Sequence, residues 1–221
     1  MVHPAHSQIR SHLASKHLVA TEAWLTAVLT TQRPTTPLPA LKSTILFRLL
    51  ASDFTKSLSV TSTSCFPPDV LDTSRQERLI HGPIPVQILD IDDIGHSKWS
   101  QIETIEAVER GETTKGREVI RTVVEEDSTD ATTLSSGPFK LLLQDAKGTR
   151  VYAIEISPLP GVGLGTSIGA KLILKDVKVS RGVILMDSGT VLSLAGKIAT
   201  WDKQWRADRK ERLLRTVDSE R

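Results

Sequence analysis

Residues 137–196 read GPFKLLLQDAKGTRVYAIEISPLPGVGLGTSIGAKLILKDVKVSRGVILMDSGTVLSLAG. Within this stretch, apolar side chains alternate with polar ones in four segments, and each segment ends at Gly, Pro, Ser or Asp. The segments are residues 139–144, 150–156, 169–179 and 183–194, the last interrupted at 187–189. Alternation bounded by turn residues is typical of β-strands. Short, evenly spaced strands indicate a small barrel or sandwich.

A further strand is predicted upstream, where residues 84–91 read IPVQILDI. Apolar side chains fall on both of its faces, as in a strand that is buried from two sides. A wide gap separates this strand from the next. Five strands in this order predict a Greek-key barrel of the OB (oligonucleotide/oligosaccharide-binding) type within residues 82–221.

Helical spacing precedes and follows the predicted barrel. Apolar residues recur at intervals of three and four in residues 6–32, where Thr21 could cap a second helix, and again in 41–50 and 69–80. We therefore expect an α+β protein, with a three-helix bundle in residues 1–81 packed on a five-stranded OB-type barrel. A C-terminal helix is predicted at 197–217, with Trp201 and Trp205 against the barrel.

The connection between the first two strands, residues 96–137, is far longer than most loops. Its first part fits either a helix or an extended strand. The rest is rich in Thr, Glu and Gly. A mostly polar insertion with a small apolar patch fits a docking arm for another protein, and it fits a tolerated surface loop equally well. The apolar patch of the insertion that such an arm would present consists of Val119, Ile120, Val123 and Val124.

Composition sets broad limits. The formal net charge of +2 does not point to a partner, although residues 96–137 are acidic in balance and both ends of the chain are basic. Cys65 is the single cysteine, so no disulfide can form within the chain and a reducing compartment is expected. No apolar run is long enough to cross a membrane, and we expect no membrane partner and no secretory signal.

Three sequence patterns resemble metal-binding or nucleotide-binding motifs, but each lacks a feature that its motif requires. Asp90, Asp92 and Asp93 resemble a magnesium-binding cluster, but no further ligand follows at a fixed spacing. Residues 161–165 read GVGLG, yet the third glycine of a dinucleotide-binding loop is replaced by Thr166. The histidines near the start of the chain have no zinc-motif spacing: His3, His6, His12 and His17. We expect no catalytic residues, no metal and no cofactor, so an enzyme on a barrel scaffold is the least favoured class.

Single-stranded nucleic acid is the alternative ligand for such a barrel. Binding of this kind needs aromatic platforms and a basic groove. Phe139 and Tyr152 are the aromatic residues of segment 138–196. Phosphate contacts could come from the basic residues Lys171, Lys175, Lys178 and Arg181. An OB-fold single-stranded nucleic-acid-binding module with weak direct DNA contact therefore stays open as a second hypothesis.

Several blocks, in order, resemble the RecQ-mediated genome instability protein family. They are GPIPVQI at 82–88, DDIG at 92–95, LLQD at 142–145, VYAIE at 151–155, GAKL at 169–172, GVILM at 182–186 and VLSLAG at 191–196. The preceding helices also suit that family. One departure is Ala195, which stands where many relatives carry glycine, and the insertion does not align.

The resemblance implies a non-catalytic partner of topoisomerase III, joined to a RecQ-family helicase in a nuclear complex that promotes decatenation and dissolution of double Holliday junctions. Such a role belongs to DNA repair, recombination and replication. The resemblance further implies that the insertion reaches the topoisomerase and influences its DNA gate. Under this hypothesis Trp99, Ile102 and the apolar patch meet the enzyme, and Lys171, from the block GAKL, faces it from the barrel surface.

Overall fold

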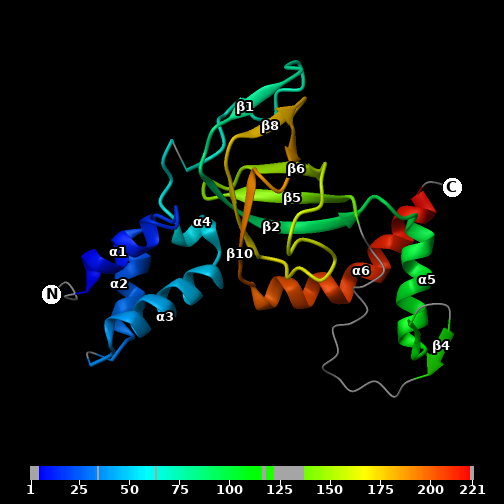
Figure 1. Ribbon diagram of the computed structural model, residues 1–221, viewed down its shortest axis with the longest axis horizontal. Coiled ribbons are helices and arrows are strands. Elements are labelled where there is room, and N and C mark those ends of the chain that lie inside the picture. Colours follow the sequence, from blue (N-terminus) through cyan, green and yellow to red (C-terminus); the bar gives the residue numbers. More distant parts are fainter. Residues whose placement is uncertain (1–4, 34, 63, 116–117, 122–136, 220–221) are drawn as a thin grey trace.

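The structure, a computed structural model, describes residues 5–33, 35–62, 64–115, 118–121 and 137–219. It confirms an α+β protein in which N-terminal helices precede an OB-type sheet and a long C-terminal helix follows it (Figure 1). The helices of the described residues are α1 (His6–Ala14), α2 (Glu22–Thr30), α3 (Leu38–Leu50), α4 (Phe54–Ser57), α5 (Lys98–Glu109) and α6 (Ala199–Ser219). Among the described residues, no helix combines the length and apolar character needed to span a membrane.

Local signals explain where the first helices begin. The side chain of Thr21 accepts a hydrogen bond from the Trp24 backbone N–H at 3.3 Å, which confirms it as the cap that separates α2 from α1. Asp53 caps α4 in the same way, accepting from the Thr55 N–H at 3.0 Å. These helices bury a core of their own that includes Ile9, Leu25 and Ile45.

One curled sheet forms the OB domain. Its strands are β1 (Arg78–Ile80), β2 (Ile84–Asp93), β5 (Phe139–Asp145), β6 (Arg150–Glu155), β7 (Lys171–Leu174), β8 (Val177–Ser180), β9 (Val183–Met186) and β10 (Val191–Ala195). The hydrogen-bonded order is β1-β8-β9-β6-β5-β2-β7-β10, so the sheet is open, with β1 and β10 at its edges, where we expected a closed barrel of five strands. The predicted strand 169–179 divides into β7 and β8 because Asp176 takes a left-handed conformation (φ 51°).

The predicted helix at 69–80 is wrong. This segment forms turns and then β1, which pairs with β8. Asp72 accepts hydrogen bonds from the Ser74 backbone N–H and hydroxyl, a local arrangement that competes with helix formation. Within this segment Val70 and Ile80 are buried whereas Leu71 and Leu79 are exposed.

The insertion begins as a helix. After β2 the chain turns at His96 and forms α5, which resolves the open choice between helix and strand in favour of the helix. A hairpin of β3 (Glu112–Lys115) and β4 (Glu118–Arg121) follows. Asp93 at the end of β2 pairs with Phe139 at the start of β5, so the insertion leaves and re-enters the sheet at neighbouring points.

The helical unit packs directly on the sheet. Ala146 and Ile173 of the OB domain belong to the same buried cluster as the N-terminal helices. Close to this junction, a Cβ atom on Gly196 (φ 96°) would lie 2.7 Å from the Leu50 carbonyl oxygen, so only glycine fits. On the other side, α6 runs along the sheet towards α5, and Trp205 is buried in the sheet's core with Trp201 packed against it, as predicted (Figure 1).

Candidate functional site

The first helix of the insertion, α5, is fixed to the OB domain. Ser97 caps it by accepting from the Ser100 N–H at 3.1 Å. Gln101 is buried and its Nε2 donates to the carbonyl oxygens of Asp93 (3.0 Å) and His96 (3.1 Å). Ile102 beside it is only 2% exposed. The base of the insertion is therefore an integral part of the folded protein.

Charged side chains of α6 hold the outer part of α5. Lys210 Nζ lies 2.7 Å from Glu109 Oε2 and 3.3 Å from Glu106 Oε1. The hydrogen bond with Glu109 raises the pKa of Lys210. Arg209 Nη2 donates to Gln101 Oε1 at 3.3 Å. Because these contacts span more than two turns of α5, the helix stands in a defined orientation on α6 (Figure 1).

Trp99 is the one predicted partner-binding residue that the described side chains place on the surface, where it is 53% exposed. The expectation for Ile102 is wrong, since that side chain packs inward from α5. Val119 and Ile120 lie in β4, whose backbone pairs with β3. Val123 and Val124 lie outside the described residues.

Lys171 is not on the barrel surface, and the expectation that it faces a partner there is wrong. Its side chain is 0% exposed, with Nζ 2.9 Å from Gln87 Oε1 and 4.5 Å from the centre of the Phe54 ring. The helical unit supplies Phe54, and its packing on the sheet covers the lysine. Burial lowers the pKa of Lys171 to about 7.

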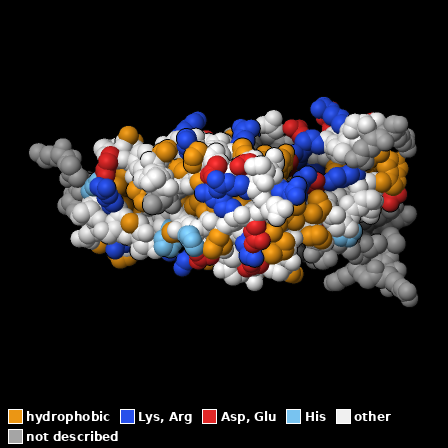
Figure 2. Space-filling view, turned by 90° about the horizontal axis from the view of Figure 1, so that it is seen from above, with side chains coloured by type: hydrophobic (Ala, Val, Ile, Leu, Met, Phe, Trp, Pro, Cys, Tyr) orange, Lys and Arg blue, Asp and Glu red, His pale blue; other side chains and the backbone are white. Residues whose placement is uncertain are grey.

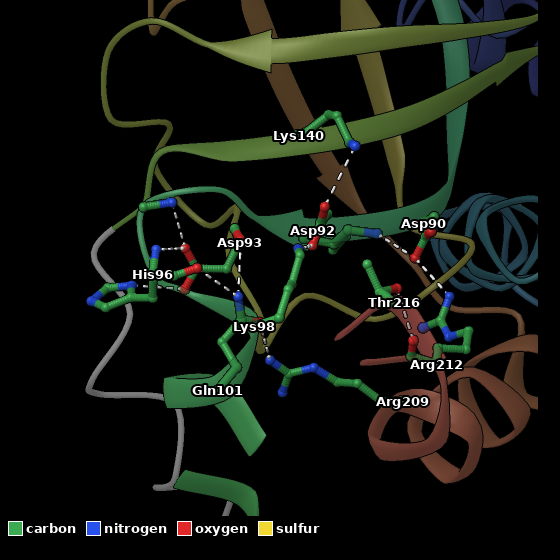
Figure 3. Close-up of polar contacts among 12 residues, drawn as sticks. Asp90, Asp92, Asp93, His96, Lys98, Gln101, Lys140, Arg209, Arg212 and Thr216 are labelled. Atoms are coloured by element: carbon green, nitrogen blue, oxygen red, sulfur yellow. Dashed lines mark hydrogen bonds and ion pairs between the residues drawn. The ribbon is translucent and has the colours of Figure 1, made fainter. Parts of the chain in front are cut away.

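The three aspartates of β2 do not converge on one point (Figure 3). Asp90 Oδ1 accepts from Trp205 Nε1 at 2.5 Å and pairs with Arg212 Nη1 at 3.1 Å. Asp92 pairs with Lys98 and, at 3.4 Å, with Lys140. Among the described residues, no group of three or more His, Cys, Asp or Glu side chains could hold a metal ion.

Asp93 has a different role from its two neighbours. Its Oδ1 accepts from the Gly95 N–H at 2.9 Å, and its Oδ2 lies 2.9 Å from His96 Nδ1. Since the carboxylate is buried and holds the turn between β2 and α5, it acts as a structural group.

Basic residues of α6 complete a groove that sequence reasoning missed. It has a volume of about 310 Å³ and lies between α6 and the strands β2, β5 and β6. Arg209 and Arg212 both lie over the Trp205 ring, at 5.8 and 5.2 Å from its centre. Burial lowers the pKa of Arg209, an effect that Asp93 opposes. The spacing of Trp205, Arg209 and Arg212 along one helix face was a signal that could have revealed the groove.

Charge is mixed on the molecular surface. Figure 2 shows basic and acidic side chains interspersed along the length of the molecule, with hydrophobic side chains between them. Binding sites must therefore be sought in local clusters, such as α5 with Trp99 and the groove that Arg209 and Arg212 line.

Comparisons with known proteins follow the same division of the chain. Residues 66–209 match the family model described as the RMI1 N-terminal OB-fold domain, and residues 13–57 match the RMI1 N-terminal helical domain. The RecQ-mediated genome instability protein 1 of Schizosaccharomyces pombe is 31% identical over 173 residues, which cover 71% of this chain and 72% of that protein. The helical unit, the OB-type sheet and the extended similarity together show that this chain belongs to the RMI1 family.

Proposed function

We propose that this chain is a non-catalytic subunit that binds topoisomerase III and acts with a RecQ-family helicase to maintain genome stability. In this role it promotes decatenation and the dissolution of double Holliday junctions in the nucleus. Membership of the RMI1 family supports the proposal, as does a relative whose name refers to RecQ-mediated genome instability.

The observation that carries the proposal is the presentation of Trp99. An exposed tryptophan is costly in contact with water and is among the residues that contribute most to protein interfaces. Trp99 stands on a helix that Gln101 and Lys210 fix to the rest of the protein. A rigid helix that carries an exposed aromatic side chain loses little entropy when a partner binds it.

The insertion is also well placed to act on a partner after binding. Its two ends are held together by the pairing of Asp93 with Phe139. Movement of the insertion relative to the OB domain would therefore act directly on β2 and β5, two neighbouring strands in the interior of the sheet. An arm of this kind can bias the DNA gate of a topoisomerase if it binds the open and closed states with different affinity.

A non-catalytic role fits the state of the acidic residues. Asp90 and Asp92 are each paired with cationic side chains, and Asp93 is committed to a turn. These contacts give the three carboxylates structural roles, which supports the proposal of a non-catalytic subunit.

The experiment is to replace residues 111–136 by a short Gly/Ser linker and to measure topoisomerase III binding and decatenation separately. We expect binding to be retained, because α5 and Trp99 remain, and decatenation to fall. Full decatenation by the variant would show that the insertion beyond α5 is only a spacer. The wild-type chain and a Leu192→Ala variant, altered at an exposed position on β10, are the controls.

A further inference from the structure

Apolar side chains gather on the outer face of β6 and β9, two parallel strands that are neighbours in the interior of the sheet. Tyr152 and Ile156 of β6 are 52% and 59% exposed. Side chains two residues apart on a strand lie on the same face, so the half-buried Ile154 lies between them, and the half-buried Val183 and Leu185 share one face of β9. Because Ile154 pairs in register with Leu185, these five side chains form one patch, which we call the β6–β9 face.

The β6–β9 face is contiguous rather than scattered. Single exposed apolar residues are common on protein surfaces, whereas a patch built from neighbouring strands marks an interaction site. The alternate residues of the same strands, such as Ala153 and Ile184, point the other way and are buried in the core of the sheet. At β6 and β9 the sheet therefore has apolar side chains on both faces, although the described residues fully cover only one of them.

Two arginines without ionic partners lie at one end of the β6–β9 face. Arg150 begins β6, and Arg181 lies in the turn between β8 and β9. Since β6 and β9 are parallel, both arginines are at the end where the two strands start. Their side chains are exposed, and among the described residues neither forms an ion pair or a side-chain hydrogen bond. This end of the face therefore attracts acidic groups.

Lysines border the β6–β9 face on both sides. Lys140 of β5 is the register partner of Ile154, and Lys178 of β8 is the register partner of Leu185. Lys140 lies 3.4 Å from Asp92, and Lys178 lies 2.9 Å from Glu77. Because these two lysines already have carboxylate partners, the arginines contribute most of the attraction for an acidic group.

The pairing of the two strands decides the form of the partner. β6 pairs with β5 and β9, and β9 pairs with β6 and β8, so neither strand has a free edge to which another strand could be added. An extended peptide laid across the face would leave backbone N–H and C=O groups against apolar side chains. An α-helix satisfies those groups internally, and its width of about 10–12 Å covers two strands about 4.8 Å apart together with their flanks.

We propose that the β6–β9 face binds an amphipathic helix of another protein. Its apolar stripe packs on Tyr152, Ile154 and Ile156, and acidic residues at one of its ends meet Arg150 and Arg181. The six residue steps from Arg150 to Ile156 span about 20 Å in a strand, which corresponds to about 13 residues of helix. The inference does not depend on the proposed topoisomerase contact, because α5 with Trp99 does not contribute to the face.

The test uses the full chain and a peptide library. Random peptides of about 16 residues, long enough for four helical turns, are displayed on phage and selected on the wild-type chain. The enriched sequences should have apolar residues at intervals of three and four, with Asp and Glu concentrated at one end. The most enriched peptide is then synthesised with a fluorescent label, and fluorescence anisotropy over a range of salt concentrations gives its Kd.

Two variants with matched controls locate the binding site. Ile156→Glu should raise the Kd of the peptide about 10-fold or more, because apolar contact is lost, whereas Leu192→Glu at an exposed position on β10 should keep the wild-type value. Arg150→Glu should raise Kd about 3-fold or more and weaken its salt dependence, whereas Lys203→Glu on the exposed side of α6 should not. Trp99→Ala should bind the peptide as the wild type does. Circular dichroism melting confirms that each variant is folded.

The proposal is overturned if the selection enriches no peptide, or if the enriched peptides are basic or lack helical spacing. It is also overturned if either Ile156→Glu or Arg150→Glu binds the peptide as its control does. Sedimentation velocity tests the remaining occupant, a second copy of this chain. A wild-type dimer that Ile156→Glu converts to a monomer would show that the face joins two copies, and would contradict the proposal.

Discussion

The ammonium group of Lys171 lies 4.5 Å from the centre of the Phe54 ring, which joins β7 of the OB domain to α4 of the helical unit. Gln87 connects the two, because its Oε1 accepts from both Lys171 Nζ (2.9 Å) and the Phe54 N–H (3.0 Å). Its Nε2 donates to Asp53 at 2.8 Å. The junction between the two units therefore contains a buried lysine whose Nζ contacts an amide and an aromatic face, with Asp53 one contact farther away.

This arrangement predicts how stability depends on pH. Burial lowers the pKa of Lys171 from 10.5 to about 7 in the folded protein. Between these values the unfolded chain holds a proton that the folded chain has lost, so the free energy of unfolding should rise with pH, at most about 1.4 kcal/mol per pH unit. Lys171→Met should abolish this rise in urea unfolding experiments between pH 7 and pH 10. Lys178→Met, at an exposed position, should keep the wild-type profile. An unchanged pH profile in Lys171→Met would contradict the burial of a titrating lysine.

Ala195 offers a stabilising substitution. Its φ of 58° lies in the left-handed region, which disfavours residues with a Cβ atom. Ala195→Gly should raise the free energy of unfolding by about 1 kcal/mol, measured by chemical denaturation. The matched control is Ala207→Gly in the middle of α6, which should destabilise by a similar amount of about 1 kcal/mol because glycine weakens a helix interior. Loss of stability in Ala195→Gly would show that this backbone is not strained.

Trp205 tests how α6 is held on the sheet. Its indole N–H donates to Asp90 at 2.5 Å while its ring packs in the sheet's core. Trp205→Phe keeps much of the apolar contact but removes the donor, so we expect a loss of about 1.5–3 kcal/mol in unfolding free energy, the range for hydrogen bonds to charged groups. Far-ultraviolet circular dichroism in guanidinium chloride gives the value. A midpoint equal to that of the wild type would mean that this hydrogen bond does not contribute to stability.

Much of the fold could be predicted because its signals are local. The alternation in residues 139–144 and 150–156 corresponds to β5 and β6, and the Thr21 cap corresponds to the start of α2. The helix prediction for 69–80 failed because it rested only on the spacing of apolar residues. In the structure the Asp72 side chain accepts a hydrogen bond from the Ser74 backbone N–H and stabilises a turn instead. β1 depends on pairing with β8, a contact between residues about one hundred positions apart that no local pattern reveals.

The candidate site was less predictable because it depends on packing between distant segments. In the sequence Lys171 alternates with apolar residues, as a lysine on the exposed face of a strand would. It is buried because Phe54 of the helical unit packs over it. Ile102 and Trp99 are both apolar residues of α5, yet Ile102 is buried and Trp99 is exposed. The difference follows from the position of α6 beside the helix. The groove beside α6 needs side chains from five elements, β2, α5, β5, β6 and α6, so no single stretch of sequence could show it.

Trp99 provides the most direct test of the central claim, that this chain binds topoisomerase III through α5. The measurement is the Kd of the purified full chain for topoisomerase III from the same organism, by isothermal titration calorimetry, for the wild type, Trp99→Ala and the surface control Leu192→Ala. We expect a complex with the wild type and the control, and binding weakened by about 30-fold or more in Trp99→Ala, as for loss of a tryptophan at the centre of an interface. Absence of a complex, or equal affinity of Trp99→Ala and the wild type, would contradict it.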